Sequence, residues 1–222
     1  MLRSVSVLYY LVVVHVLPSD SQFDGCLPKQ FNCIAAKLRG EYTPLGSHLT
    51  DSTEKVFYDE DRRMIAREES GQTDGQPFLT IRLYDYPNKT LYDVVTIDGK
   101  EICVKLILDE PFKKVCIPEN TQLIWGKSVI GIYPNMVPTN RYKWEVGNLT
   151  TELTYTYTMQ PVLLDTYGTD QDGVSVFETV WVQNITHTAA SADIFTPPPS
   201  CKDAVFQDTQ EQNRRNVGYL AF

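Results

Sequence analysis

Several segments of this chain alternate apolar and polar side chains at every second residue, which is the pattern of a β-strand with one buried face. The clearest segments span residues 79–83, 153–159 and 174–182, and in the second of them leucine, tyrosine and methionine alternate with threonine. Helical spacing is scarce by comparison. The sequence therefore predicts a mainly β protein of antiparallel sheets that cover one another, with few helices.

One hairpin can be read directly from its turn residues. A strand over residues 94–97 leads into Asp98-Gly99, and a second strand over residues 100–108 returns. Aspartate and glycine accept the positive φ angles of a type I′ turn, whose twist suits paired antiparallel strands. On the returning strand, Cys103 is predicted to point away from the most apolar face.

An acidic stretch over residues 165–172 precedes the strand that begins near Val174. In the spacing of an EF-hand loop, Gly168 stands where the first aspartate ligand is needed, and Thr179 stands where the bidentate glutamate is needed. We therefore interpret Asp170–Gly173 as a solvated hairpin turn and not as a calcium loop.

The N-terminal region has the features of a secretory signal. Arg3 precedes a mostly apolar run over residues 5–17, which is shorter than the ~20 residues of a membrane-spanning helix. Ser19 and Ser21 follow in the spacing that signal peptidase prefers. We therefore predict a signal peptide over residues 1–21 and a mature protein that is secreted into the extracellular space.

The mature chain, residues 22–222, is long enough to form one domain with its own core. We expect a single β domain there, with a flexible C-terminal tail from about residue 207. The formal net charge of −8 at pH 7 repels nucleic acid and anionic lipid head groups. No second apolar run approaches spanning length, so the protein is predicted neither to bind nucleic acid nor to be embedded in a membrane.

Sequons and cysteines agree with an extracellular location. An odd number of cysteines in an oxidising compartment leaves one thiol free or shared with a second chain. The five mature cysteines are Cys26, Cys33, Cys103, Cys116 and Cys201. The three N-x-[ST] sequons, which predict a glycosylated surface, are at Asn88, Asn148 and Asn184.

Patterns typical of catalysis are missing from the sequence. The histidines of the mature chain are His48 and His187, and neither lies in a nucleophile motif or in zinc-ligand spacing. Gly126-Lys127-Ser128 lacks the earlier glycine of a phosphate-binding loop. We therefore predict that the protein is not an enzyme and has no cofactor, although its acidic surface tolerates calcium.

Four segments carry a resemblance to a known family. The sequence FTPPPSC at residues 195–201 resembles the proline–cysteine signature near the end of ependymin-related proteins. Tyr58-Asp59 followed by Arg62-Arg63 is similar to an early family motif, and residues 104–116 resemble the family's strand that ends in a cysteine. Residues 158–162 fall where the family commonly has a cysteine two residues before Pro-Val. The segments occur in the family's order, and the resemblance is to its invertebrate members.

The resemblance implies two stacked antiparallel sheets, curved into a half-open barrel around a hydrophobic pocket. It implies a secreted or lysosomal glycoprotein, often a homodimer, that is associated with calcium and with hydrophobic ligands. The leading hypothesis is therefore a secreted binding protein for a lipid or fatty acid. The alternative is an extracellular-matrix, adhesion or signalling protein without a bound small ligand, because both need the same β scaffold.

The resemblance also implies disulfide bonds. Cys116 and Cys201 match a pair that is bridged in the family, which predicts that bond. Cys33 matches the early family cysteine, but a methionine occupies the position of its usual partner. A bond from Cys103 to Cys33 or to Cys26 is the expected substitute, and a free Cys26 would be able to bridge two chains.

The candidate pocket residues are apolar side chains that alternate along three predicted strands. Each of them fits an ordinary core equally well, but together they would bury an acyl chain at roughly 0.8 kcal/mol per CH₂. They are Leu106, Leu108, Tyr155, Tyr157, Phe177 and Trp181.

Overall fold

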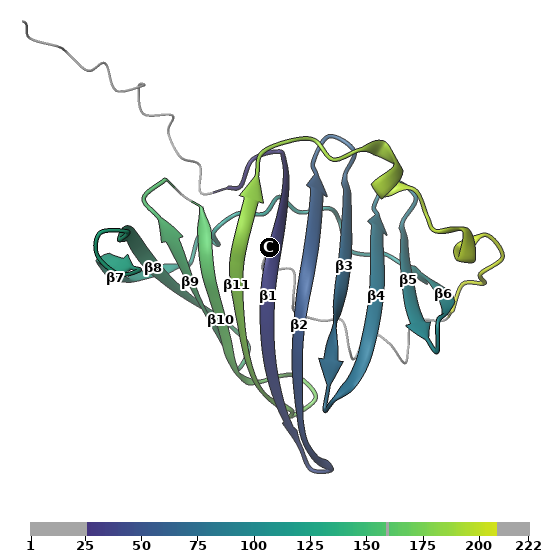
Figure 1. Cartoon of the computed structure of the whole chain (residues 1–222), viewed down its shortest axis with the longest axis horizontal. Coiled ribbons are helices and arrows are strands. Elements are labelled where there is room, and N and C mark those ends of the chain that lie inside the picture. The colour runs from purple at the N-terminus through teal and green to yellow at the C-terminus, as the bar shows by residue number, and fades with distance from the viewer. Residues whose placement is uncertain (1–25, 159, 208–222) are drawn as a thin grey trace, which may run out of the picture.

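Eleven antiparallel strands form one open, curved sheet in the computed structural model, which describes residues 26–158 and 160–207 (Figure 1). Their order across the sheet is β6-β5-β4-β3-β2-β1-β11-β10-β9-β8-β7. In chain order the elements are β1 (Gln30–Thr43), β2 (Gly46–Asp59), β3 (Met64–Thr73), β4 (Gln76–Asp85), β5 (Thr90–Ile97), β6 (Lys100–Ile107), β7 (Gln122–Ile130), β8 (Val137–Val146), β9 (Leu149–Thr156), β10 (Pro161–Thr169), β11 (Ser175–Thr186) and the 3-10 helices η1 (Ala192–Phe195) and η2 (Pro199–Cys201).

The sheet consists of two successive meanders. Strands β1 to β6 lie side by side in chain order, and so do β7 to β11, while β1 and β11 pair in the middle. The edge strands are β6 and β7, which do not pair with each other. The predicted mainly β, antiparallel fold class is confirmed, and the two sheets implied by the resemblance are joined into one by the β1–β11 pairing.

The predicted hairpin is present at the expected turn. Asp98 and Gly99 join β5 to β6 with φ angles of 51° and 74°. Positive φ at both residues is the requirement of a type I′ turn, and aspartate and glycine meet it at low cost. Residues 79–83 and 94–97 lie within β4 and β5, as their alternating pattern predicts.

The main core lies on the side of the sheet that is crossed by residues 108–121, which lead from β6 back to the opposite edge (Figure 1). We call this side the inner face and residues 108–121 the strap. The Phe31 ring stacks on Tyr58 with centroids 5.0 Å apart, and Tyr58 stacks on Phe112 of the strap at 5.6 Å. The buried core residues are Leu27, Phe31, Cys33, Ala35, Val56, Tyr58, Ile65, Trp144, Leu153, Tyr155, Leu164 and Val180.

A smaller core covers the opposite side of the sheet, the outer face. Ala66 of β3, Leu83 of β4 and Phe195 of η1 are buried against one another there. The Arg62 guanidinium lies 5.4 Å from the centroid of the Phe195 ring, which is within the range of a cation–π contact. η1 therefore covers the outer face over β3 and β4.

Two disulfides join Cys26 to Cys116 and Cys103 to Cys201, and Cys33 is a free, buried thiol. The predicted Cys116–Cys201 bond is therefore wrong, and so is a bond from Cys103 to Cys33 or Cys26. The physical reason is that the strap places Cys116 on the inner face, whereas η2 places Cys201 against Cys103 on the outer face. The sheet itself separates the two cysteines that the resemblance pairs.

The described chain ends beside an edge strand. Phe206 forms a bridge with Lys105 of β6, and the N–H of Gln207 donates to the carbonyl of Lys105 at 2.9 Å. The predicted signal peptide, residues 1–21, and the predicted tail beyond residue 207 lie outside the described residues. Within the ranges that are described, none of the helices has the length and apolar character that crossing a membrane requires.

Candidate functional site

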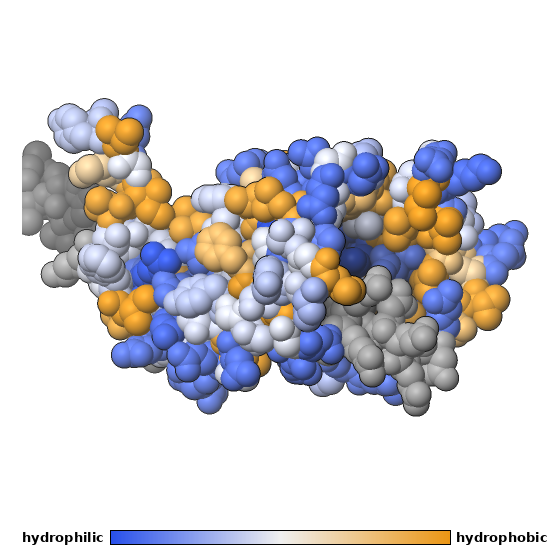
Figure 2. All heavy atoms as spheres, turned by 90° about the horizontal axis from the view of Figure 1, so that it is seen from below, coloured by the Kyte–Doolittle hydropathy of each residue, from blue (hydrophilic) through white to orange (hydrophobic). Residues whose placement is uncertain are grey.

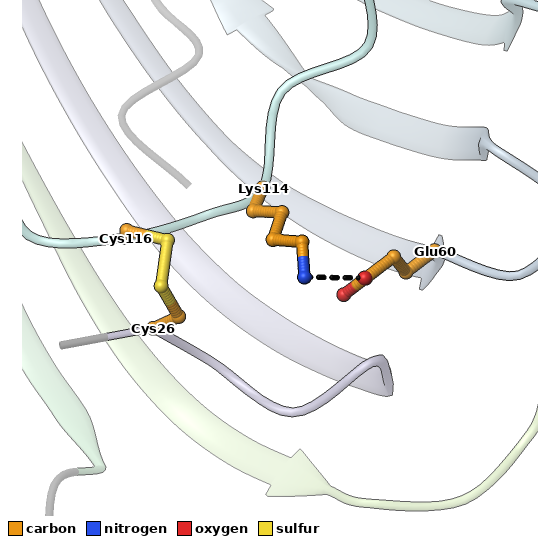
Figure 3. Close-up of a disulfide and its surroundings, with 4 residues drawn as sticks. All are labelled: Cys26, Glu60, Lys114 and Cys116. Carbon is orange, nitrogen blue, oxygen red and sulfur yellow. Dashed lines mark ion pairs between the residues drawn. A yellow bond between two sulfur atoms is a disulfide. The ribbon is translucent and has the colours of Figure 1, made fainter. Parts of the chain in front are cut away.

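The strap is fixed across one end of the inner face (Figure 3). The Cys26–Cys116 disulfide ties it to the segment before β1, and the N–H of the residue after Cys26 donates to the carbonyl of Val115 at 2.8 Å. The Lys114 ammonium lies 2.8 Å from the Glu60 carboxylate, which follows the end of β2. A covalent bond, a backbone hydrogen bond and an ion pair therefore hold this end of the inner face closed.

The inner-facing side chains of β8 to β11 are largely apolar or aromatic, and we call them the apolar half. Val180 lies opposite Leu164, which lies opposite Leu153, which lies opposite Tyr142. These side chains form one row across four strands because partners in register project from the same face. Tyr155 packs edge-to-face on Tyr142 with centroids 6.2 Å apart, and burial raises the pKa of Tyr155 well above its usual range.

The same row is no longer apolar where it reaches β1. Lys37 lies between Val180 on β11 and Ser52 on β2. In the next row toward the strap, Glu54 of β2 lies directly opposite Glu69 of β3. We give the name charged half to seven polar inner-facing residues of β1 to β5; they are Lys37, Ser52, Glu54, Arg67, Glu69, Arg82 and Asp93.

Arg67 and Glu54 form a bidentate ion pair in the charged half, in which Glu54 is buried and Arg67 is partly buried. Arg67 Nε donates to Glu54 Oε1 at 2.6 Å, and Arg67 Nη2 donates to Glu54 Oε2 at 2.8 Å. Burial acts to lower the pKa of Arg67, but Glu54, with smaller contributions from Tyr84 and Glu69, outweighs it and raises that pKa above its ordinary value. Each charge of such a pair depends on the other, because either one alone would be buried without compensation.

Glu69 is held in its ionised form by its neighbours. The Lys37 ammonium forms an ion pair with the Glu69 carboxylate, and Ser52 Oγ donates to Glu69 Oε1 at 2.8 Å. Burial acts to raise the pKa of Glu69, but Lys37, Ser52 and Arg67 together outweigh it and lower that pKa below its ordinary value. A carboxyl group held ionised in this way is a poor proton donor near neutral pH.

Further charges continue the charged half toward the end of the sheet remote from the strap. Arg39 of β1 pairs with Glu178 of β11 at 3.2 Å, and Arg39 Nε donates to Glu41 Oε1 at 2.7 Å. Arg82 and Asp93 lie closer to the strap, with Nε and Oδ1 3.4 Å apart. The polar part of the inner face is therefore a ladder of paired charges that runs along the strands.

The free thiol of Cys33 lies on β1, beside the boundary between the two halves. Burial raises the pKa of Cys33 to about 12, and the Glu54 carboxylate adds to this rise. The thiolate is the nucleophile in cysteine chemistry, and at neutral pH almost none of it is present at such a pKa. Cys33 therefore behaves as a small apolar core side chain.

The predicted pocket residues divide between the two faces and the ends of strands. Leu106 and Tyr155 are buried on the inner face. Leu108 follows the end of β6 and is partly buried, while Tyr157 follows the end of β9 and is half exposed. Phe177 and Trp181 lie on the outer face, where they are 52% and 44% exposed, because the inner-facing positions of β11 are those of Val180 and its alternating neighbours.

The most important inner-face residues were missed by the sequence analysis. Phe31, Tyr58 and Phe112 connect the sheet to the strap, and Tyr142 belongs to the apolar half. Leu153 was placed on the apolar face of its strand but was not named among the pocket residues. The alternation of Phe31, Cys33 and Ala35 along β1 was a usable signal for part of this set. The family motif over residues 104–116 reads most of the strap as part of a strand, but β6 ends at Ile107. Nothing in the motif marks Phe112 as a core residue, because Phe112 packs through tertiary contacts alone.

Metal binding and glycosylation stay predictions. Among the described residues, no group of three or more His, Cys, Asp or Glu side chains is placed to hold a metal ion. The Asp170 carboxylate instead accepts the N–H groups of Asp172 and Val174, both at 2.9 Å, which closes the predicted turn between β10 and β11. The sequon asparagines are exposed; they are Asn88, Asn148 and Asn184.

No family model and no curated protein matches this sequence. Among solved structures, an uncharacterized conserved protein from Thermus thermophilus is similar to this chain with a TM-score of 0.47 and 14% identity, covering 82% of this chain and 91% of that one. A structure of PNGF-II is similar with a TM-score of 0.26 and 8% identity, covering 74% of this chain and 29% of the other.

Proposed function

We propose that this protein is a secreted glycoprotein that binds an amphipathic lipid, such as a fatty acid, on the inner face of its sheet. The acyl chain would lie against the apolar half and the polar head against the charged half. The observation that carries the proposal is that the inner face places the apolar row of β8 to β11 directly beside the charged residues of β1 to β5, where β11 pairs with β1.

The chemistry of the two halves supports this division of roles. Burying an acyl chain against Leu153, Leu164 and Tyr142 contributes roughly 0.8 kcal/mol per CH₂. A polar head group needs hydrogen-bond partners once it leaves water, and the charged half supplies both cations and carboxylates in fixed positions. Glu69 is held ionised, and Glu54 is paired with Arg67, so binding is better supported than acid–base catalysis.

Secretion is supported by the two disulfides, which persist in oxidising compartments. Membership of the ependymin-related family rests on the sequence resemblance and belongs to the same proposal. The same resemblance leads us to expect that this protein associates with calcium and forms a homodimer. Both can be tested in the same experiments as lipid binding.

The test is native mass spectrometry of protein secreted from eukaryotic cells, with its glycans trimmed, followed by organic extraction. A stoichiometric adduct that is released as a lipid would support the carrier and define its ligand class. A mass without any adduct, together with no binding of a fluorescent fatty acid, would contradict the lipid-binding function and favour the matrix or signalling alternative.

A pair of variants places the ligand on the molecule. Tyr142→Ser removes a partly buried aromatic side chain from the inner face, and Trp181→Ser removes one from the outer face. Fatty-acid affinity should fall by about 10- to 100-fold in Tyr142→Ser, because its ring supplies roughly 1.5–3 kcal/mol of apolar contact. Affinity should be unchanged in Trp181→Ser, and equal losses in both variants would argue against inner-face binding.

A further inference from the structure

The hairpin formed by β7 and β8 exposes an unusual amount of apolar surface. Trp125 is 66% exposed, and Ile132 and Tyr133 at the tip are 85% and 83% exposed. A cluster of exposed apolar side chains on one short hairpin is a candidate interaction site. The exposed large apolar side chains of the hairpin are Leu123, Ile124, Trp125, Val129, Ile132, Tyr133, Met136 and Val137.

These side chains surround the hairpin and do not share one face. Leu123 lies opposite Tyr142 and therefore projects on the inner side, whereas Trp125 lies opposite Arg141 and projects on the outer side. Figure 2 shows apolar side chains, interspersed with polar ones, on the projection at the end of the molecule that carries β7 and β8 in Figure 1. A flat partner would cover one side of such a hairpin and leave the other in water.

The tip of the hairpin is a defined turn. The N–H of Asn135 donates to the carbonyl of Ile132 at 2.8 Å, and the peptide bond between Tyr133 and Pro134 is cis. Gly131 has a φ of 99°, and a Cβ there would lie 2.4 Å from the Asn135 carbonyl oxygen. The turn therefore needs glycine at this position and presents its two bulkiest apolar side chains at its outer end.

The charge of the hairpin differs from that of the whole chain. Residues 120–144 contain no aspartate or glutamate, although the chain carries a net charge of −8. Arg141 and Lys143 are paired with carboxylates outside this segment, among them Glu152 and Glu145. An approaching zwitterionic surface therefore meets no carboxylate at the hairpin tip, while the acidic remainder of the chain disfavours a strongly anionic surface.

The backbone of the hairpin limits how deeply it can enter an apolar medium. β7 is an edge strand, so one row of its N–H and C=O groups has no strand partner. Unpaired backbone groups are excluded from the hydrocarbon of a bilayer but are tolerated among head groups. Tryptophan and tyrosine favour that same interfacial layer.

We propose that the β7–β8 tip docks the protein on a zwitterionic lipid surface by shallow insertion of Ile132, Tyr133 and Met136, with Trp125 at the level of the head groups. The apolar side chains on every side of the hairpin then leave water together, which contact with one side of a flat partner does not achieve. The inference does not depend on a lipid being held on the inner face.

The test is flotation of the full-length, secreted protein with phosphatidylcholine vesicles. The wild-type protein should float with the vesicles, and the double variant Ile132→Asp/Tyr133→Asp should bind at least about tenfold more weakly, because two apolar side chains no longer leave water on docking. Both positions are highly exposed, so folding should be unaffected, and the far-UV circular dichroism and melting temperature check this.

A matched control carries the same substitutions elsewhere. Tyr42 and Leu45, near the β1–β2 turn, are 66% and 97% exposed, and Tyr42→Asp/Leu45→Asp adds the same charge to the chain. This control should float like the wild type. Quenching of tryptophan fluorescence by brominated phosphatidylcholine should fall in Trp125→Phe and persist in Trp181→Phe.

Three results would overturn the proposal. They are an absence of wild-type flotation, equal flotation of both double variants, and binding that requires added phosphatidylserine. A second copy of the chain is the competing occupant, and light scattering after size exclusion tests it. If the wild type is a dimer, the Ile132→Asp/Tyr133→Asp variant is a monomer and neither binds vesicles, the hairpin is a self-association surface.

The two proposals can fail separately. If the protein binds vesicles but yields no extractable lipid, the lipid-carrier function is rejected and membrane docking is retained.

Discussion

The apolar half and the charged half of the inner face share the same sheet and the same strap, but they are stabilised by different forces. Leu153 and Leu164 gain stability from close packing, which has no preferred direction and accepts other apolar side chains of similar volume. Glu54 and Arg67 gain stability only from each other, with a fixed bidentate geometry. The charged half is therefore the more specific and the more fragile of the two regions.

Releasing the strap should have the largest effect, because it lies over the inner face as a whole. The Cys26→Ser/Cys116→Ser variant opens a loop with a sequence separation of 90 residues and should lower the free energy of unfolding by about 4–5 kcal/mol on the chain-entropy model. Urea denaturation measures the loss. Alkylation of Cys33 without denaturant should become fast in the variant, and a thiol that stays protected would show that the strap is not needed to close this face.

Breaking the Arg67–Glu54 pair of the charged half should lower the free energy of unfolding by nearly as much. Arg67→Ala leaves the Glu54 carboxylate buried and unpaired, so the free energy of unfolding should fall by about 3–5 kcal/mol. Lys55→Ala breaks the exposed pair with Glu68 on the same strands and should cost less than about 1 kcal/mol. Equal losses in the two variants would contradict the buried role of the pair. Replacing both Arg67 and Glu54 by leucine should recover most of the stability.

Breaking the apolar half should cost somewhat less and should depend on volume. Leu153→Ala should lower the free energy of unfolding by about 3 kcal/mol through the cavity that it leaves, whereas Leu153→Met should lower it by less than about 1.5 kcal/mol. Chemical denaturation of both variants measures the difference. A methionine variant as unstable as the alanine variant would mean that this half also depends on precise geometry.

The smallest expected effect is a change in how the free energy of unfolding depends on pH in acid. The folded-state pKa of Glu69 lies below its ordinary value of 4.5, so the folded protein binds this proton more weakly than the unfolded chain. The stability that Glu69 contributes is present above that ordinary value and is lost as the pH falls through the folded pKa. Urea denaturation at a series of pH values measures this dependence. Below pH 4.5 the free energy of unfolding should fall less steeply with decreasing pH in Glu69→Gln than in the wild type. In Leu153→Ala it should fall as steeply as in the wild type.

Much of the fold could be predicted from the sequence, because strand alternation and turn chemistry are local. The Asp98-Gly99 hairpin and the strand over residues 79–83 follow from a few neighbouring side chains. Alternation gives two faces to each strand but does not say which one is inner, and for this reason it wrongly places Phe177 and Trp181 in the pocket. The aromatic residues are the larger side chains of β11, but its valines face the core.

The disulfides and the charged half could not be predicted, because they depend on contacts between distant segments. Cys103 and Cys201 are 98 residues apart and meet only because η2 crosses the outer face at β6. Glu54 and Glu69 lie in polar stretches of the sequence, where no local pattern indicates burial. Their burial follows from the curvature of the sheet and from cations on neighbouring strands, which local patterns do not record.

The central pairing of β1 with β11 sets a constraint on biosynthesis. The first meander can form as soon as β6 has been synthesised. One edge of β1 then stays unpaired until β11 leaves the ribosome. During that interval Cys33 lacks its neighbour Ile185, and its thiol is exposed to the other cysteines of the nascent chain. Correct oxidation therefore favours slow disulfide formation or prompt isomerisation, and pairing of β11 with β1 ends the risk by burying the thiol.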